Sequence, residues 1–184
     1  MNNKKSKVII IGGCPRAGKT TLSVKLVRSG LGFSKISGDH LGDDFLSNFE
    51  RVKTLLEGLL EDAGAYGMNS IFDYFPDNFT LDDIEKLPFK DKLDMYFFGF
   101  PDIPVEEIKY NIRHYAKPTD WIYMYDMDDD YLEVVAKRIY DFNIKLKQDC
   151  EKYGYRFINT GIGDERNIVL NLLYDEIMGI YFND

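Results

Sequence analysis

The feature that most constrains this chain is a strand-loop-helix segment at residues 8–28. It opens with Val-Ile-Ile-Ile, and four consecutive β-branched residues are typical of a strand buried on both faces, as in a parallel sheet. From Gly13 to Thr20 the chain matches the phosphate-binding pattern G-x-x-x-x-G-K-[ST] at every fixed position, and the residues from Thr21 to Arg28 look helical. A loop of this pattern between a buried strand and a helix predicts a binding site for a nucleoside triphosphate.

Each fixed residue of this loop has a chemical reason to be there. Glycines let successive backbone N–H groups turn inward around a polyphosphate without a Cβ in the way. The helix that follows adds the positive end of its dipole to the same anion site. We expect Lys19 to contact the β- and γ-phosphates and the Thr20 hydroxyl to bind Mg²⁺. The expected nucleotide-binding residues are Gly13, Cys14, Pro15, Arg16, Ala17, Gly18, Lys19, Thr20 and Thr21.

Length and charge bound the remaining possibilities. The chain has 184 residues, so we expect a single domain over residues 1–184, with a disordered tail at residues 1–6. It carries 23 basic and 31 acidic residues, a net charge of −8, without a clustered basic stripe. Because sequence-independent nucleic-acid binding depends on neutralising phosphates, this charge argues against a nucleic-acid partner. No apolar run approaches membrane-spanning length, so we expect no membrane partner either.

The cysteines indicate the redox compartment. Only Cys14 and Cys150 are present, and their positions have neither metal-ligand nor CxxC spacing. We therefore expect a reducing, intracellular setting and a cytoplasmic location. The sequence leaves the oligomeric state open.

Strands and helices alternate along the chain. Short β-branched or aromatic runs predict strands at 8–11, 33–37, 69–75, 94–99 and 155–159. Apolar residues at three- and four-residue steps predict helices at 21–29, 44–63, 104–115, 129–153 and 165–178, with a short helix that begins at Thr80. Residues 121–125 are compatible with an extra strand or a loop. The alternation predicts an α/β fold with a parallel sheet, helices on both faces and ligands at the carboxyl ends of the strands.

Two carboxylates follow predicted strands at that edge. Asp39 comes two residues after the second strand, where a carboxylate could accept the proton of an attacking hydroxyl or bind substrate. Asp73 ends the third strand, where a carboxylate could hold Mg²⁺ directly or through water. The alternatives are a turn or helix-capping role for Asp39 and a solvated strand end for Asp73.

Transfer of a phosphoryl group also needs cations close to the equatorial oxygens. Arg113, at the end of a predicted helix, and Arg138, one position before Ile139 of the apolar stripe in a later helix, are the candidates. Arg113 falls in the least regular part of the chain, about 101–128, which we interpret as a lid. For both arginines the alternative is an ordinary surface cation.

Three segments together resemble one known family. Gly-Gly-Cys-Pro-Arg-Ala-Gly-Lys-Thr-Thr-Leu at 12–22, Ile-Ser-Gly-Asp at 36–39 and Ile-Phe-Asp at 71–73 resemble the P-loop small-molecule kinases, which include nucleotide, nucleoside and shikimate kinases. The resemblance implies a three-layer P-loop NTPase fold with a five-stranded parallel sheet in order 2-3-1-4-5, a mobile lid, and ATP with Mg²⁺ as donor. In that group an Asp at the end of the second strand often contacts the acceptor, which fits Asp39.

The chain departs from better-known members in two places. Its candidate lid lacks a dense arginine cluster, and Tyr74-Phe75-Pro76 replaces the glycine triplet that shikimate kinases have after the third strand. We therefore predict an ATP-dependent phosphotransferase with a small-molecule acceptor that the sequence does not identify. The alternatives are an ATP-binding regulatory protein or slow NTPase without an acceptor, and a phosphotransferase of the same fold that modifies a toxin or antibiotic.

Overall fold

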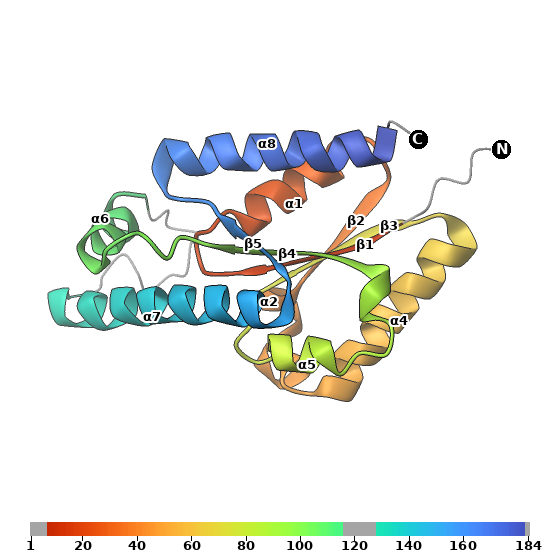
Figure 1. Ribbon diagram of the computed structural model, residues 1–184, viewed down its shortest axis with the longest axis horizontal. Helices are drawn as coiled ribbons and strands as arrows, with labels where there is room; N and C mark the ends of the chain where they lie inside the picture. Colours follow the sequence, from red (N-terminus) through yellow and green to blue (C-terminus); the bar gives the residue numbers. More distant parts are fainter. Residues whose placement is uncertain (1–6, 116–127, 183–184) are drawn as a thin grey trace.

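The computed structural model describes residues 7–115 and 128–182, which form a three-layer α/β structure (Figure 1). All strand pairs in the central sheet are parallel, and the strand order is β2-β3-β1-β4-β5. The strands are β1 (Val8–Gly13), β2 (Phe33–Ser37), β3 (Asn69–Tyr74), β4 (Leu93–Gly99) and β5 (Arg156–Asn159). The predicted fold class and strand order are confirmed.

Helices cover both faces of the sheet. In Figure 1, α1 and α8 lie above the sheet, whereas α4, α5 and α7 lie below it. The helices are α1 (Lys19–Val27), α2 (Gly38–Leu41), α3 (Asp43–Leu46), α4 (Phe49–Tyr66), α5 (Leu81–Glu85), α6 (Val105–Tyr115), α7 (Asp129–Tyr153) and α8 (Gly163–Phe182), with a 3₁₀ turn at Lys90–Lys92.

The central strand β1 explains why the layers form on both sides. Its side chains alternate between the two faces, and every residue of the strand is buried. Ile9 packs into a core with α1 and α8, whereas Ile10 packs into a second core with α4 and α5. Burial of an aliphatic side chain contributes about 1.5–3 kcal/mol, so β1 fixes the helices around the phosphate-binding loop that follows it.

The predicted helix over 44–63 is wrong at its start. The chain forms the short helix α3 there, and α4 begins only at Phe49 because Asn48 adopts an extended conformation and caps it. The Asn48 side chain accepts a hydrogen bond from the Arg51 N–H at 3.2 Å. Phe45 packs against the same core as the apolar face of α4, so the hydrophobic spacing runs across the break and conceals it.

Two other predicted helix starts are confirmed by their capping contacts. Thr80 begins α5 through a capping box in which its backbone N–H donates to the Asp83 carboxylate at 3.1 Å. At α7, the Asp128 side chain accepts from the Tyr131 N–H at 2.8 Å. Both caps place acidic groups at the positive end of a helix dipole, where they stabilise the first turn.

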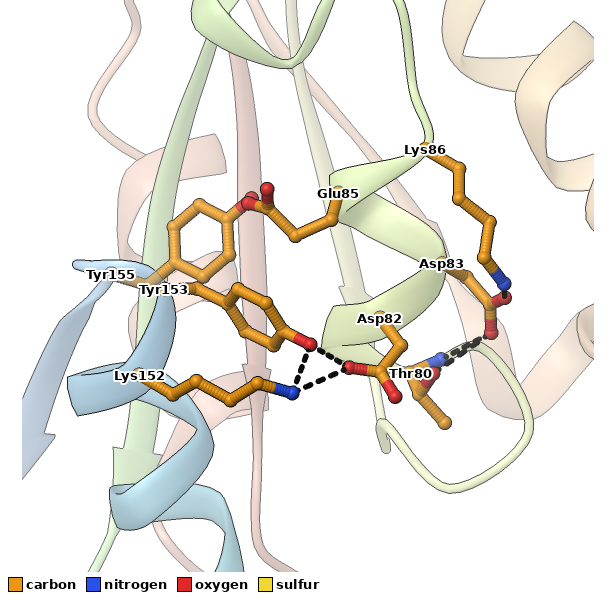
Figure 2. Close-up of polar contacts among 8 residues, drawn as sticks. All are labelled: Thr80, Asp82, Asp83, Glu85, Lys86, Lys152, Tyr153 and Tyr155. Carbon is orange, nitrogen blue, oxygen red and sulfur yellow. Dashed lines mark hydrogen bonds and ion pairs between the residues drawn. The ribbon is translucent and has the colours of Figure 1, made fainter.

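A polar cluster joins α5 to the end of α7 and the start of β5 (Figure 2). The Tyr153 hydroxyl and the Lys152 ammonium both contact the Asp82 carboxylate. The Tyr155 hydroxyl donates to the Glu85 carboxylate at 2.5 Å. These contacts connect segments about 70 residues apart in sequence and join α5 to the end of α7.

Some sequence predictions fall outside the described residues. These are the tail at 1–6, the ambiguous segment at 121–125 and most of the second half of the candidate lid. Within that lid, α6 is described, and Figure 1 shows it beyond the carboxyl end of the sheet. The single-domain organisation and the lid stay predictions. None of the helices in the described part of the chain is long and apolar enough to cross a membrane.

Candidate nucleotide-binding site

The phosphate-binding loop connects the end of β1 to the first turn of α1, at the carboxyl edge of the sheet. Its glycines are favoured by close packing against other elements of the chain as well as by backbone conformation. Gly13 has φ +145, and a Cβ there would lie 2.3 Å from the Phe98 carbonyl oxygen on β4. Gly18 has φ +92, and a Cβ there would lie 2.5 Å from a methyl carbon of Leu170 on α8. Gly13 therefore excludes any other residue, because the clash is with backbone, whereas a side chain at Gly18 would be strained and would have to displace Leu170.

The Lys19 side chain turns back over the loop. Its ammonium donates to the carbonyl oxygens of Gly13 at 2.8 Å and Cys14 at 2.9 Å. Burial lowers the pKa of Lys19 below its usual value, although the nearby carboxylates Asp39 and Asp73 oppose that shift. The loop therefore holds a partly desolvated cation within electrostatic reach of two acids.

Asp73, at the end of β3, is 2% exposed and is neutralised by a lysine that sequence reasoning missed. The Lys35 ammonium on β2 lies 2.9 Å from Asp73 Oδ2. The Ser23 hydroxyl on α1 lies 3.1 Å from the same oxygen and 2.8 Å from the Lys19 carbonyl oxygen, so its single proton serves one acceptor at a time. Ser23 lies one helical turn after Lys19, and this spacing is the sequence signal that could have placed Ser23 near the site.

Asp39 lies directly beyond β2, in the first turn of α2, and is exposed. The turn that carries it fits closely against β3, because a Cβ on Gly38 would lie 2.6 Å from Tyr74 Cβ. The charge of Asp39 raises the pKa of Lys19, against the larger lowering caused by burial. The structure thus brings Lys19, Asp39 and Asp73 together at one edge of the sheet.

The two candidate arginines have other neighbours. Arg113, in the last turn of α6, forms an exposed ion pair with Asp129 in the first turn of α7. Arg138, on α7, is exposed, and its charge has a small influence on Asp77 after β3. Partial burial is the main cause that raises the pKa of Asp77, and Arg138 opposes it. Within the described residues, the ion pair of Arg113 joins α6 to α7.

Residues that could hold Mg²⁺ are few. The part of the chain that the structure describes has no group of three or more His, Cys, Asp or Glu residues able to hold a metal ion. Magnesium in nucleotide sites, however, takes one or two protein ligands and completes its shell with phosphates and water. The exposed Thr20 in the first turn of α1 and the buried carboxylate of Asp73 fit that pattern.

Cys14 lies in the loop but has the character of a packing residue. It is fully buried, and its Sγ lies 3.7 Å from the Ile139 carbonyl oxygen on α7. Burial raises the pKa of Cys14 to about 12. Its thiol is therefore protonated at neutral pH and lacks nucleophilic character.

Arg166, in α8, is a second side chain at the loop that sequence reasoning missed. Its Nη1 donates to the Arg16 carbonyl oxygen at 2.9 Å, although the two residues lie 150 positions apart. No local pattern relates residues so distant in sequence, so only the fold could reveal this contact.

Comparisons with known proteins agree with the fold. No protein-family model matches this sequence, and no curated protein matches it significantly. Solved structures do match: a shikimate kinase from Bacteroides thetaiotaomicron has a TM-score of 0.54 and 15% identity, over 94% of this chain and 98% of that chain. A shikimate kinase from Acinetobacter baumannii in complex with shikimate has a TM-score of 0.51 and 15% identity, over 96% of each chain.

The class defined by the sheet order and the loop is therefore the P-loop kinase-like fold. Within that class the chain is similar to shikimate kinases over nearly its whole length. At 15% identity this likeness shows the fold alone, and the reaction and the acceptor have to be argued from the site.

Proposed function

We propose that the protein is a phosphotransferase that moves the γ-phosphate of ATP to a hydroxyl group of a small molecule. The observation that carries the proposal is the partly desolvated Lys19 ammonium, which lies over the loop and within electrostatic reach of Asp39 and Asp73. A cation in this position, at a helix N-terminus, favours a polyphosphate. A carboxylate near this cation can accept the proton that the acceptor hydroxyl loses in phosphoryl transfer.

Lys19 and the loop amides are proposed to bind the β- and γ-phosphates. The two hydrogen bonds from Lys19 to loop carbonyls hold its side chain in a bent conformation, so little conformational entropy is lost when phosphate oxygens become its partners. Because its carbonyl partners are neutral, exchange for a charged phosphate strengthens the hydrogen bonds of Lys19.

Thr20 is proposed to bind Mg²⁺ through its hydroxyl, and Asp73 to orient a water ligand of the ion. When bound, the metal neutralises negative charge between the phosphates. Lys35 and Ser23 both contact Oδ2 of Asp73 and hold the carboxylate in one orientation, which suits a group that acts on the metal through a water molecule.

Asp39 is proposed to orient the acceptor hydroxyl and accept its proton. It is exposed directly beyond the carboxyl end of β2, on a turn whose backbone is held against β3. Arg113 and Arg138 are proposed to approach the transferred group and neutralise charge. Arg113 would have to leave its exposed partner Asp129, and an exposed ion pair of this kind costs only about 0.2–1 kcal/mol to break.

The test is transfer of labelled γ-phosphate from ATP into a cell metabolite extract. Wild type is expected to give a labelled small molecule, identified by its mass, whereas Lys19→Ala abolishes transfer. Asp39→Asn is expected to keep ATP binding and lose turnover by about 10²–10⁴-fold. Asp44→Asn, the same change on an exposed carboxylate of α3, is the matched control and is expected to turn over like wild type.

Other outcomes point elsewhere. Release of free phosphate alone, at equal rates in wild type and Asp39→Asn, would favour a slow NTPase. ATP binding without any product would favour a regulatory protein. Turnover by Asp39→Asn equal to that of wild type, with a labelled product, would keep the kinase and remove the role of Asp39.

A further inference from the structure

The helix α8 contributes a charged side chain to the phosphate-binding loop. Arg166 lies in the early part of α8, and its Nη1 donates to the Arg16 carbonyl oxygen at 2.9 Å. Its Nε is buried and has no hydrogen-bond partner among the described residues. Burial of a guanidinium nitrogen without a partner is unfavourable, so an arginine at this position needs a compensating contact elsewhere.

The residue that Arg166 contacts has an unusual backbone. Arg16 has φ +67 and is the one non-glycine residue with positive φ in the described parts of the chain. A left-handed conformation costs an L-residue about 1–2 kcal/mol and persists only where the surroundings hold it. The hydrogen bond from Arg166 restrains the carbonyl group of this residue.

That carbonyl belongs to the peptide that also carries the Ala17 N–H. In a trans peptide, the C=O and N–H groups point in opposite directions. The Ala17 N–H is directed to the Cys14 carbonyl oxygen at 3.3 Å, and this oxygen also accepts from the Lys19 ammonium at 2.9 Å. With its carbonyl fixed toward α8, the peptide therefore presents its N–H on the side of the loop where Lys19 lies.

We propose that Arg166 is a positioning residue of the nucleotide site, which fixes the Arg16–Ala17 peptide so that its N–H can exchange its 3.3 Å contact with the Cys14 carbonyl oxygen for a phosphate oxygen. The proposal rests on the proposed function, because its consequence is tighter binding of a nucleoside triphosphate. Preorganised N–H donors bind an anion more strongly because they need no reorientation. By this argument α8 is part of the site as well as a cover for the sheet.

A second polar contact between α8 and the loop side of the molecule supplies a matched control. The Lys25 ammonium on α1 donates to the Asn171 side-chain oxygen at 2.7 Å and lies 3.9 Å from the centre of the Tyr174 ring. Lys25→Met removes an α1–α8 contact without altering a group that contacts the loop. Comparison with Arg166 variants separates loop positioning from general docking of α8.

The experiment compares Arg166→Met, Arg166→Lys and Lys25→Met with wild type. Amide hydrogen exchange over residues 14–18 is measured without nucleotide, and binding of ATP with Mg²⁺ by calorimetry. Arg166→Met is expected to speed exchange in the loop and weaken ATP binding about 10-fold, the effect of losing one hydrogen bond from a charged group. Arg166→Lys is expected to restore part of both effects, whereas Lys25→Met lowers the melting temperature and leaves both unchanged.

Unchanged loop exchange in Arg166→Met overturns the proposal, as do equal effects of Arg166→Met and Lys25→Met on the loop. If Arg166→Met does not fold, Arg166→Lys decides the matter, since it too must exchange faster than wild type in the loop. A wild-type protein that binds no ATP would refute the proposed function instead. In that case loop exchange still supports or overturns the positioning role by itself.

Discussion

The ion pair between Lys35 and Asp73 allows a prediction of magnitude. The two side chains are 20% and 3% exposed and their charged atoms lie 2.9 Å apart, so Lys35→Met leaves a carboxylate in the interior without its cation. Loss of one partner of a buried pair costs about 3–5 kcal/mol. Because solvent reaches Lys35, and because Ser23 still contacts the carboxylate, we expect a loss of about 2–4 kcal/mol in the free energy of unfolding.

Urea unfolding of a double-mutant cycle measures this effect. Asp73→Asn is expected to cost about 1–2 kcal/mol, since the amide oxygen still accepts from Ser23 and Lys35 can turn toward solvent. The double variant Lys35→Met/Asp73→Asn is expected to be more stable than Lys35→Met alone, because it no longer holds an unpaired buried charge.

The control is Lys53→Met on α4. Lys53 pairs with Glu50 at 3.5 Å, but the Glu50 side chain is 74% exposed, so the change is expected to cost no more than about 0.5 kcal/mol. The reasoning is refuted if Lys35→Met costs as little as Lys53→Met. Strict additivity in the Lys35/Asp73 cycle would refute it too, since additivity means that the two groups do not interact.

Two further predictions concern the loop and the polar cluster. Gly18→Ala forces an alanine into a left-handed conformation and brings its Cβ within 2.5 Å of Leu170, so urea unfolding should show a loss of about 2–4 kcal/mol in the free energy of unfolding. Gly42 has φ +78 and open space around it, so Gly42→Ala should lose only about 1–2 kcal/mol. Equal losses in the two variants would show that the Leu170 side chain moves aside. Hydrogen bonds from Lys90, the larger cause, and from Tyr155 lower the pKa of Glu85. The stability that this carboxylate adds is therefore present above its unfolded pKa of about 4.3 and is lost as pH falls through the lower pKa of the folded protein. Melting temperatures between pH 6 and 3 should therefore fall less steeply in Tyr155→Phe than in wild type, and identical slopes would show that Tyr155 does not influence Glu85.

The sheet could be predicted from sequence because its signals are local. The β-branched run of β1 and the loop pattern after it lie within one segment, and the caps at Thr80 and Asp128 lie next to the helices they begin. The break before α4 could not be predicted, because Phe45 and the apolar face of α4 pack against the same core with uninterrupted spacing. Asn48 carries the only local signal of the break, and a helix-capping residue is easily absorbed into a longer amphipathic pattern.

The residues of the candidate site also differ in whether the sequence could predict them. Lys19, Asp39 and Asp73 could be chosen from sequence because each lies at or beyond the carboxyl end of a strand, and parallel strands end at a common edge. Lys35 and Arg166 could not, since a lysine within a strand and an arginine early in a helix have no chemical meaning until their partners are known. Both carry charge to groups of the predicted site: Lys35 to Asp73 at the end of β3, and Arg166 to the Arg16 carbonyl of the motif. In this protein the motif therefore provides the groups that would contact the nucleotide, and distant residues hold those groups in position.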